Sequence, residues 1–224
     1  MFRWVLKNDK LNRTFQRDNG RTQARFTRFT TLGTITGHDV NLYLLLLAIS
    51  LLSLSLQWPP LHELTLWHLS AIEQGQWWRI LTGNFAHTNF AHWAMNLAAL
   101  WIISFVFKPT ARQLLIPLVL ISLAVGGMIL ASDMQFYVGL SGTLHGLFAY
   151  YALNEALNGR RSSWLLVLGV IGKVAWEQWF GASASTAELI GARVATEAHL
   201  AGLISGLLLS VMLFSLRKRV RKKD

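Results

Sequence analysis

Five polar side chains that could act on a substrate lie within long apolar segments of this 224-residue chain: His92, Asn96, Ser141, His145 and His199. If those segments cross a lipid bilayer, each polar group there is costly and is a candidate functional residue. The alternative is that they only form hydrogen bonds between helices. All five lie toward the same ends of their segments, so the sequence favours a shared site.

Ser141 has the most informative surroundings. It follows Gly139-Leu140 and precedes Gly142, at the start of an apolar segment that we expect to be a helix. Glycines let the backbone turn sharply and approach another chain closely. The unpaired N–H groups at a helix N-terminus can also stabilise an oxyanion. This setting indicates a serine nucleophile.

The expected partner is His199. It begins a helical face that continues with Gly202 and Gly206, and the helix that starts at Ser141 has the same small-residue spacing from Gly142 onward. Two such faces let helix backbones pack closely, which would bring the hydroxyl and the imidazole together. Histidine is the usual base for a serine near neutral pH.

The other polar residues have supporting roles in this interpretation. No Asp or Glu is placed by the sequence to join the pair, so we expect a Ser–His dyad. His92 and Asn96 share one helical face and are expected to donate hydrogen bonds to the oxyanion. Lys173 and Glu177, also four residues apart, are interpreted as an ion pair, with a transporter-like proton relay as the alternative.

Metal chemistry is not predicted. A zinc protease helix carries H-E-x-x-H, and His62-Glu63 begins that pattern, but position 66 is Leu. The chain has no Cys, which excludes cysteine-ligated metal sites and disulfide scaffolds. We expect no metal and no cofactor.

The elements that must position these residues are membrane helices. Hydrophobic residues make up 53% of the chain and charged residues 14%, against about 25% charged in a soluble domain. Apolar segments long enough to cross a bilayer predict an all-α membrane protein with six transmembrane helices. The segments are 40–58, 89–107, 113–131, 141–157, 163–180 and 195–216.

The basic residues predict the orientation. Of 21 Lys and Arg, eight lie in the first 28 residues, six in the last eight, and four in two short connections. Basic segments stay cytoplasmic, so both termini are expected there, and the net charge of +10 does not require a nucleic-acid partner. We expect a basic arm over 1–37, a membrane domain over 38–216 and a basic tail over 217–224.

The connections on the opposite, outer side differ in character. Residues 59–88 interleave Trp and Leu with polar residues, which predicts helices lying in the membrane interface. Residues 181–194 are rich in Gly, Ala, Ser and Thr, and we expect this loop to be poorly anchored and mobile.

Four short motifs lie on these segments and on the outer connection 59–88. They are Trp78-Arg79, the spaced His87, His92 and Asn96, Gly139-x-Ser141-Gly142, and Ala198-His199-x-x-Gly202-x-x-x-Gly206. Together they resemble the rhomboid family of intramembrane serine proteases. The resemblance implies a six-helix rhomboid fold with an interfacial first outer loop. It also implies Ser141 as nucleophile, His199 as general base, and His92 and Asn96 as oxyanion donors.

The same resemblance implies supporting roles for further positions. Gly202 would be the close-packing contact between two helices, Arg79 would be structural in the first outer loop, and residues 181–194 would cap the site. His87, Gly139, Gly142 and His145 would support it.

One position departs from the usual rhomboid pattern. His145 stands where most members have a Tyr that stacks on the catalytic histidine, and S-G-x-L-H-G resembles the bacterial rhombosortase subfamily. That subfamily is associated with exported proteins that end in Gly-Gly, a transmembrane helix and a basic tail. His145 could stack on His199, perturb its protonation, or simply fill space.

The sequence thus predicts an endopeptidase of the bacterial inner membrane that cuts transmembrane segments near their outer ends. Its expected partners are transmembrane protein substrates and membrane lipids. The acyl-enzyme could pass to water or to an amine acceptor. The alternative is a non-catalytic rhomboid-like protein that binds client helices.

Overall fold

The computed structural model describes residues 37–220. Nearly all of the predicted arm, 1–37, and the end of the predicted tail, 221–224, lie outside the described residues. The chain divides into two compact units, 1–40 and 41–224. Of the first unit only residues 37–40 are described, as the beginning of a helix. The second unit holds all the candidate site residues.

A long helix occupies each of the six segments predicted to be helical. The boundaries differ from the predicted ones by at most four residues. The helices are α2 (Gly37–Ser55), α6 (Phe90–Phe107), α7 (Ala111–Ile129), α8 (Ser141–Leu157), α9 (Ser163–Phe180) and α11 (Thr196–Val220).

Not all of these helices qualify as membrane spans by length and hydropathy. Within residues 37–220, α6, α7 and α11 do, and α2 qualifies together with the short helix α3 (Pro59–Thr65), which bends away by 103°. Helix α8 is only 17 residues long, and α9 carries the charged Lys173 and Glu177. The count of six spans therefore remains a prediction.

Large apolar side chains cover the outside of the long helices. Phe105 on α6, Leu165 on α9 and Leu208 on α11 are each well over half exposed, together with many others like them. A soluble surface rarely exposes so much continuous apolar area, whereas lipid tails accept it. These helices suit a lipid environment.

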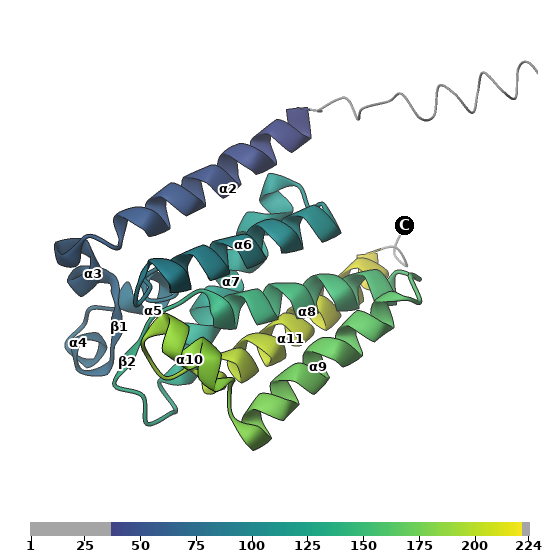
Figure 1. Ribbon diagram of the computed structural model, residues 1–224. Coiled ribbons are helices and arrows are strands. Elements are labelled where there is room, and N and C mark those ends of the chain that lie inside the picture. The colour runs from purple at the N-terminus through teal and green to yellow at the C-terminus, as the bar shows by residue number, and fades with distance from the viewer. Residues whose placement is uncertain (1–36, 221–224) are drawn as a thin grey trace, which may run out of the picture. The chain divides into compact units, whose positions relative to one another are not determined.

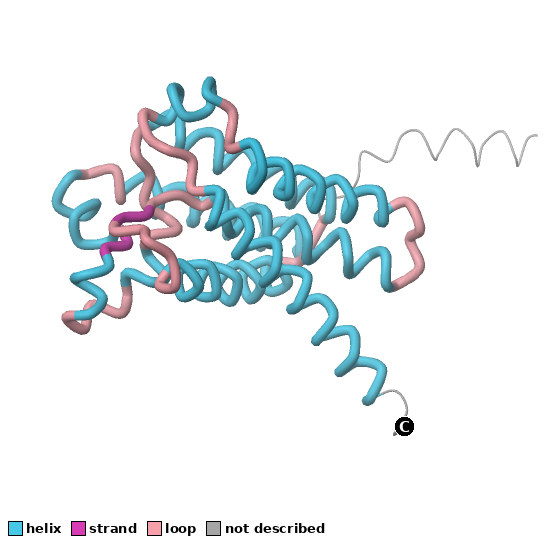
Figure 2. The backbone as a smooth tube through the Cα atoms, turned by 90° about the horizontal axis from the view of Figure 1, so that it is seen from below, coloured by secondary structure: helices cyan, strands magenta, loops and turns pink. Residues whose placement is uncertain are grey.

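Short elements connect α2 to α6 and lie at one end of the helical bundle. They are α3, β1 (Trp67–His68), α4 (Leu69–Glu73) and α5 (Arg79–Thr82). Strand β1 pairs antiparallel with β2 (Phe136–Tyr137), Trp67 opposite Tyr137, and Figure 2 shows this pair at that end. The indole of the fully buried Trp67 donates to the carbonyl of Gly126 at 2.9 Å, which ties the connection to α7.

Helix α8 is the central element, because it contacts α6, α7, α9 and α11 (Figure 1). Its contact with α11 is the most intimate. A Cβ on Gly202 would overlap the carbonyl oxygen of Gly142, and one on Gly206 would overlap that of Gly146. The two backbones therefore touch, as small-residue faces allow.

Replacing Gly202 with Ala should destabilise the protein, because the added methyl group meets backbone that cannot move aside. Overpacking of this kind costs about 1–3 kcal/mol. We expect a lower midpoint of thermal unfolding in detergent. The control is Gly169→Ala on α9, where nothing lies within 4 Å of the new Cβ and Ala favours the helix by about 1 kcal/mol. Equal midpoints for the two variants would contradict backbone contact at Gly202.

Candidate active site

The hydroxyl of Ser141 and the imidazole of His199 are hydrogen-bonded, with Oγ and Nε2 2.9 Å apart. Ser141 is the first residue of α8, and His199 lies in the first turn of α11. Because the two helices touch just below these residues, the side chains meet across a short gap. His199 is buried and Ser141 is partly exposed, so the pair sits at an accessible edge of the core.

The backbone before Ser141 depends on glycine. Gly139 has φ +122°, a conformation that L side chains rarely adopt, and a Cβ there would lie 2.6 Å from the ring of His92. The hydroxyl of Tyr137 donates to the carbonyl of Gly139 at 2.6 Å, and the Gly139 N–H donates to Gly83 at 3.2 Å. These bonds hold the turn that delivers Ser141 to the site.

A buried polar network fixes the first turn of α8 from behind. Thr143 Oγ1 donates to Asn84 Oδ1 at 3.0 Å and lies 3.0 Å from the hydroxyl of Ser122 on α7. The amide of Asn84 donates in turn to the carbonyl of Ser122 at 3.1 Å. Buried polar networks that are satisfied in this way rigidify what they connect. The position of Ser141 at the start of α8 is therefore fixed both by α7 and by the connection between α2 and α6.

The candidate residues open onto a cavity of about 460 Å³. Four of the predicted site residues line it: His92, Asn96, Ser141 and His199. Most other lining residues are apolar or small and come from the β2 segment, from α6 and from residues 186–195. This composition suits an extended apolar peptide beside the serine.

Two predicted oxyanion donors face this cavity from α6. His92 Nδ1 lies 3.1 Å from the hydroxyl of Thr88, and because that hydroxyl donates to the carbonyl of Ile190, Nδ1 carries the proton of this contact. The Nε2 of His92 faces Gly139 and the cavity, and it can donate there only when the ring is protonated. Asn96 Nδ2 is buried and has no hydrogen-bond partner among residues 37–220. Within the same described residues, no side chain caps the N-terminus of α8. Donors without partners beside a nucleophile are what a developing oxyanion requires.

The prediction that no carboxylate joins the serine and histidine is wrong. Glu177 Oε2 on α9 lies 2.8 Å from His199 Nδ1, on the ring edge opposite Ser141. The predicted ion pair with Lys173 is also present, through the other carboxylate oxygen. In the sequence, Lys173 and Glu177 form an ion pair that needs no third residue. In the structure, the packing of α9 against α11 also brings a carboxylate oxygen of Glu177 to His199.

His145 stacks on His199, one of the alternatives that the sequence left open. The ring centroids are 4.1 Å apart and the rings are inclined by 22°. His145 Nδ1 lies 2.7 Å from the carbonyl oxygen of Ser141, so this nitrogen carries a proton and donates it. His145 therefore contacts both the ring of His199, by stacking, and the backbone of Ser141, by a hydrogen bond.

A metal ion is the other group that these side chains could hold. Donor atoms of His145, Glu177 and His199 lie within 4.8 Å of one another. Imidazole binds a metal in the plane of its ring, at about 2.0–2.1 Å from the nitrogen. Two rings stacked at 4.1 Å and 22° direct their lone pairs along nearly parallel planes. They cannot share one ion without rotating, so the arrangement does not fit a metal.

His87 and Arg79 are among the predicted site residues that lie outside the cavity lining. His87 is buried behind His92, edge-on to its ring, and burial, with a smaller effect of His92, lowers the pKa of His87 to about 3, so it is neutral at pH 7. Arg79 is buried in the first connection. Its guanidinium donates to the carbonyls of Glu63 and Leu66 at 2.8 and 2.7 Å and to Gln76 Oε1 at 2.7 Å.

The prediction that residues 181–194 are poorly anchored is also wrong. They contain helix α10 (Ala184–Ile190). Thr88 Oγ1 donates to the carbonyl of Ile190 at 2.7 Å, and Asn89 Nδ2 donates to that of Leu189 at 3.1 Å. The anchors come from a segment about a hundred residues away, which composition alone does not show.

Comparison with known proteins agrees with this architecture. The Rhomboid domain family matches residues 74–216, which is more than half of the chain. The protein named "Putative rhomboid protease YdcA", from Bacillus subtilis (strain 168), is 26% identical over 179 residues, which cover 71% of this chain and 82% of that one. The chain therefore belongs to the rhomboid family of intramembrane serine proteases. It is an integral, multi-pass membrane enzyme of that class.

Replacing Arg79 with Ala should destabilise the first connection, because buried carbonyl acceptors lose their donors. An unsatisfied buried acceptor costs about 1–3 kcal/mol, so the unfolding midpoint in detergent should fall clearly. The control is Arg160→Ala, which removes an arginine whose side chain is 62% exposed in an ion pair with Glu155 and should cost less than about 1 kcal/mol. If Arg79→Ala is as mild as the control, the guanidinium does not hold this connection.

Proposed function

We propose that this protein cuts transmembrane segments of exported or membrane proteins near their outer ends, with Ser141 as nucleophile and His199 as general base. The observation that carries the proposal is the 2.9 Å separation of Oγ and Nε2 at the edge of a cavity. A serine hydroxyl attacks a peptide only when a base removes its proton, and this imidazole nitrogen is aligned to do so.

The chemistry is acyl transfer in two halves. Ser141 Oγ forms a bond to the scissile carbonyl carbon while its proton passes to His199 Nε2. The C–N bond then breaks, and His199 returns that proton to the leaving amine. In the second half His199 takes a proton from water, whose oxygen attacks the acyl carbon. The bond between that carbon and Ser141 Oγ then breaks, and His199 returns the proton to Oγ. An amine in place of water would give transfer instead of hydrolysis.

Negative charge on the carbonyl oxygen is stabilised by donors already in place. We assign this role to Asn96 Nδ2 and to the N–H of Ser141. His92 joins them when its ring is protonated, because a neutral ring that donates from Nδ1 to Thr88 has no proton on Nε2. Support comes from the unpartnered, buried amide nitrogen of Asn96 and the uncapped N-terminus of α8. One such donor typically lowers the barrier by about 3–4 kcal/mol.

The proposed membrane setting has six spans, with both termini on the cytoplasmic side of a bacterial inner membrane. It is supported by the clustered basic residues and by the six long helices. The site residues then lie at the outer ends of α6, α8, α9 and α11. A substrate helix enters from the lipid and unwinds beside Ser141, because the site requires extended backbone.

The proposed substrates carry a Gly-Gly pair before a transmembrane helix and a basic tail, as in the rhombosortase subfamily. The sequence feature that supports this choice is S-G-x-L-H-G, with His145 in place of Tyr. A Gly-Gly pair also weakens a substrate helix at the point where it must unwind, by about 1 kcal/mol per residue relative to Ala.

The alternative is a rhomboid-like protein that binds client helices without cutting them. A client-binding protein does not need a serine hydrogen-bonded to a histidine. The retention of this pair beside a cavity therefore favours catalysis.

Ser141→Ala and His199→Ala should each abolish cleavage of a fluorescent transmembrane substrate in proteoliposomes. The expected loss is at least about a thousandfold in kcat, because nucleophile and base act as a unit. Ser162→Ala, an exposed serine directly before α9, is the matched control and should cut at the wild-type rate. Wild-type cleavage by both site variants would remove the proposal, and a wild-type protein that binds the substrate without cutting it would favour the client-binding alternative.

Replacing Gly-Gly by Ala-Ala in the substrate should slow cleavage about tenfold to thirtyfold. The reason is that two Ala residues cost about 2 kcal/mol more to unwind than two Gly, and about 1.4 kcal/mol corresponds to a factor of ten. The measurement compares initial rates for the two substrates at equal density in the bilayer. The control substrate keeps its Gly-Gly pair and carries an Ala-Ala pair two helical turns further into the helix. Equal rates for the Gly-Gly and Ala-Ala substrates would contradict this specificity.

A further inference from the structure

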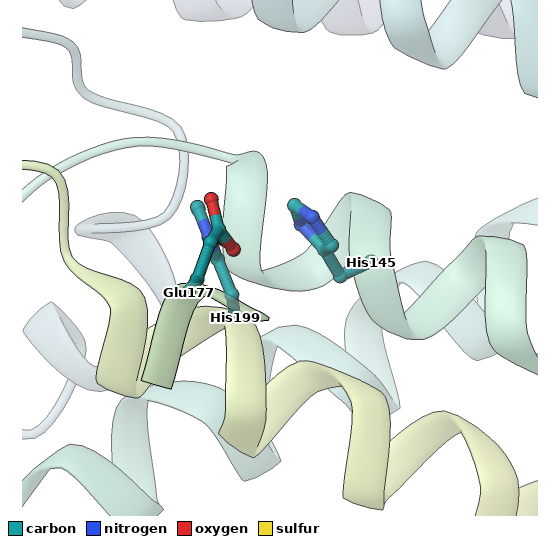
Figure 3. Close-up of side chains that lie close together, drawn as sticks. All are labelled: His145, Glu177 and His199. Carbon is teal, nitrogen blue, oxygen red and sulfur yellow. Dashed lines mark hydrogen bonds and ion pairs between the residues drawn. The ribbon is translucent and has the colours of Figure 1, made fainter. Parts of the chain in front are cut away.

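Three side chains from three helices form a continuous hydrogen-bonded line. Ser141 on α8 contacts Nε2 of His199 on α11, and Glu177 on α9 contacts Nδ1 of the same ring. Figure 3 shows Glu177 beside His199, with His145 on the neighbouring helix. We propose that Glu177 is a positioning residue that completes a Ser–His–Glu triad. This inference rests on the proposed function of Ser141 and His199.

The chemistry of the ring makes the position of Glu177 consequential. An ionised carboxylate only accepts hydrogen bonds, so Nδ1 of His199 must carry the proton in this contact. The neutral ring then has its lone pair on Nε2, where it accepts the proton of the Ser141 hydroxyl. Glu177 therefore selects the one tautomer that can act as the base.

The carboxylate is also placed to stabilise the charge that forms during catalysis. When Ser141 Oγ bonds to the carbonyl carbon, its proton moves to Nε2 and the ring becomes an imidazolium. That proton then moves to the leaving amine as the C–N bond breaks. Glu177 keeps its hydrogen bond to Nδ1–H throughout and gains no proton, so its effect is orientation and charge stabilisation.

Glu177 is itself held in place. Its side chain is only 10% exposed, and a buried charge is costly unless it is paired and hydrogen-bonded. Lys173, one helical turn earlier, pairs with Oε1, while His199 takes Oε2. Val174 on the same helix is almost fully buried, so α9 cannot rotate about its axis without exposing that side chain. Both oxygens are thus occupied, and the carboxylate cannot turn away from the histidine without breaking an ion pair.

A purely structural ion pair is the rival interpretation. An ion pair with Lys173 explains the position of Oε1. It does not explain why Oε2 also has a hydrogen-bond partner. That oxygen lies 2.8 Å from the single nitrogen of His199 that Ser141 does not use. Because the stack with His145 fixes the plane of the ring, the position of Glu177 on that edge indicates a role toward the base.

The test compares Glu177→Gln, which keeps the shape, with Glu177→Asp, which keeps the charge. If Glu177 orients and stabilises the base, Gln should lower kcat by at least about a hundredfold with little change in KM. Asp should retain more activity than Gln. A structural role predicts the reverse order, since Gln fits the space and can still hydrogen-bond. A Gln variant with near-wild-type kcat would overturn the triad.

The matched control is Glu155→Gln on α8, which removes another helical carboxylate bonded to Arg160 and Ser163, far from the cavity. It should keep kcat within about twofold. Ser141→Ala, measured in parallel, separates the two proposals. If it cuts normally, the proposed function fails. If it is inactive while Glu177→Gln is fully active, only the triad fails.

A second measurement covers the case in which a variant is less stable. A fluorophosphonate probe forms an Oγ–P bond with an activated serine and releases fluoride, so its rate reports on the base without a substrate helix. On protein purified in the folded state, Glu177→Gln should label Ser141 at least about a hundredfold more slowly than wild type. Equal labelling rates would overturn the inference.

The pH dependence gives an independent reading. The ionisable groups around His199 are Glu177 and Lys173 on α9, His145 on α8, His92 on α6 and Glu197 on α11. Of the variants above, only those of Glu177 change this set. Without the negative charge of Glu177, the imidazolium of His199 is less stabilised, so the acidic limb of the kcat/KM profile should move to lower pH in Glu177→Gln. The limb should stay in place in Glu155→Gln. An unmoved limb in Glu177→Gln would contradict the triad.

Discussion

Backbone contact between α8 and α11 is the constraint on which the site depends. The carbonyls of Gly142 and Gly146 occupy the space where side chains would stand on Gly202 and Gly206. In a membrane the hydrophobic effect does not drive helices together, so close packing of small residues supplies much of the attraction. The same contact brings Ser141 and His199, which precede Gly142 and Gly202 on their helices, within hydrogen-bonding distance.

Close helices alone do not orient a nucleophile. The turn at Gly139 and the network through Asn84 and Thr143 fix where α8 begins, and both involve the connection before α6. Arg79 holds that connection by donating to the carbonyls of Glu63 and Leu66. The polar contacts of the connection between α2 and α6 thus control the position of Ser141 on α8, because a satisfied buried polar network is rigid.

The sequence was informative where spacing along one helix carries the signal. The six helices, the paired glycine faces and the cavity-lining positions of His92 and Asn96 all follow from periodicity and from the cost of polar groups in lipid. Glu177 was misjudged because Lys173 satisfies it locally, and a carboxylate has a second oxygen whose partner depends on how α9 packs. The anchoring of α10 escaped notice for the same reason, since Thr88 and Asn89 are remote in sequence.

His199 is restrained in every direction that matters for a base. Ser141 and Glu177 occupy its two nitrogens, and His145 covers one face. His145 also donates to the carbonyl of Ser141, so the ring that stacks on the proposed base is bonded to the backbone of the proposed nucleophile. A Tyr at that position could stack but has no nitrogen to reach this carbonyl. One side chain of α8 therefore contacts both members of the proposed catalytic pair, and it holds the plane of the His199 ring next to the first turn of α8.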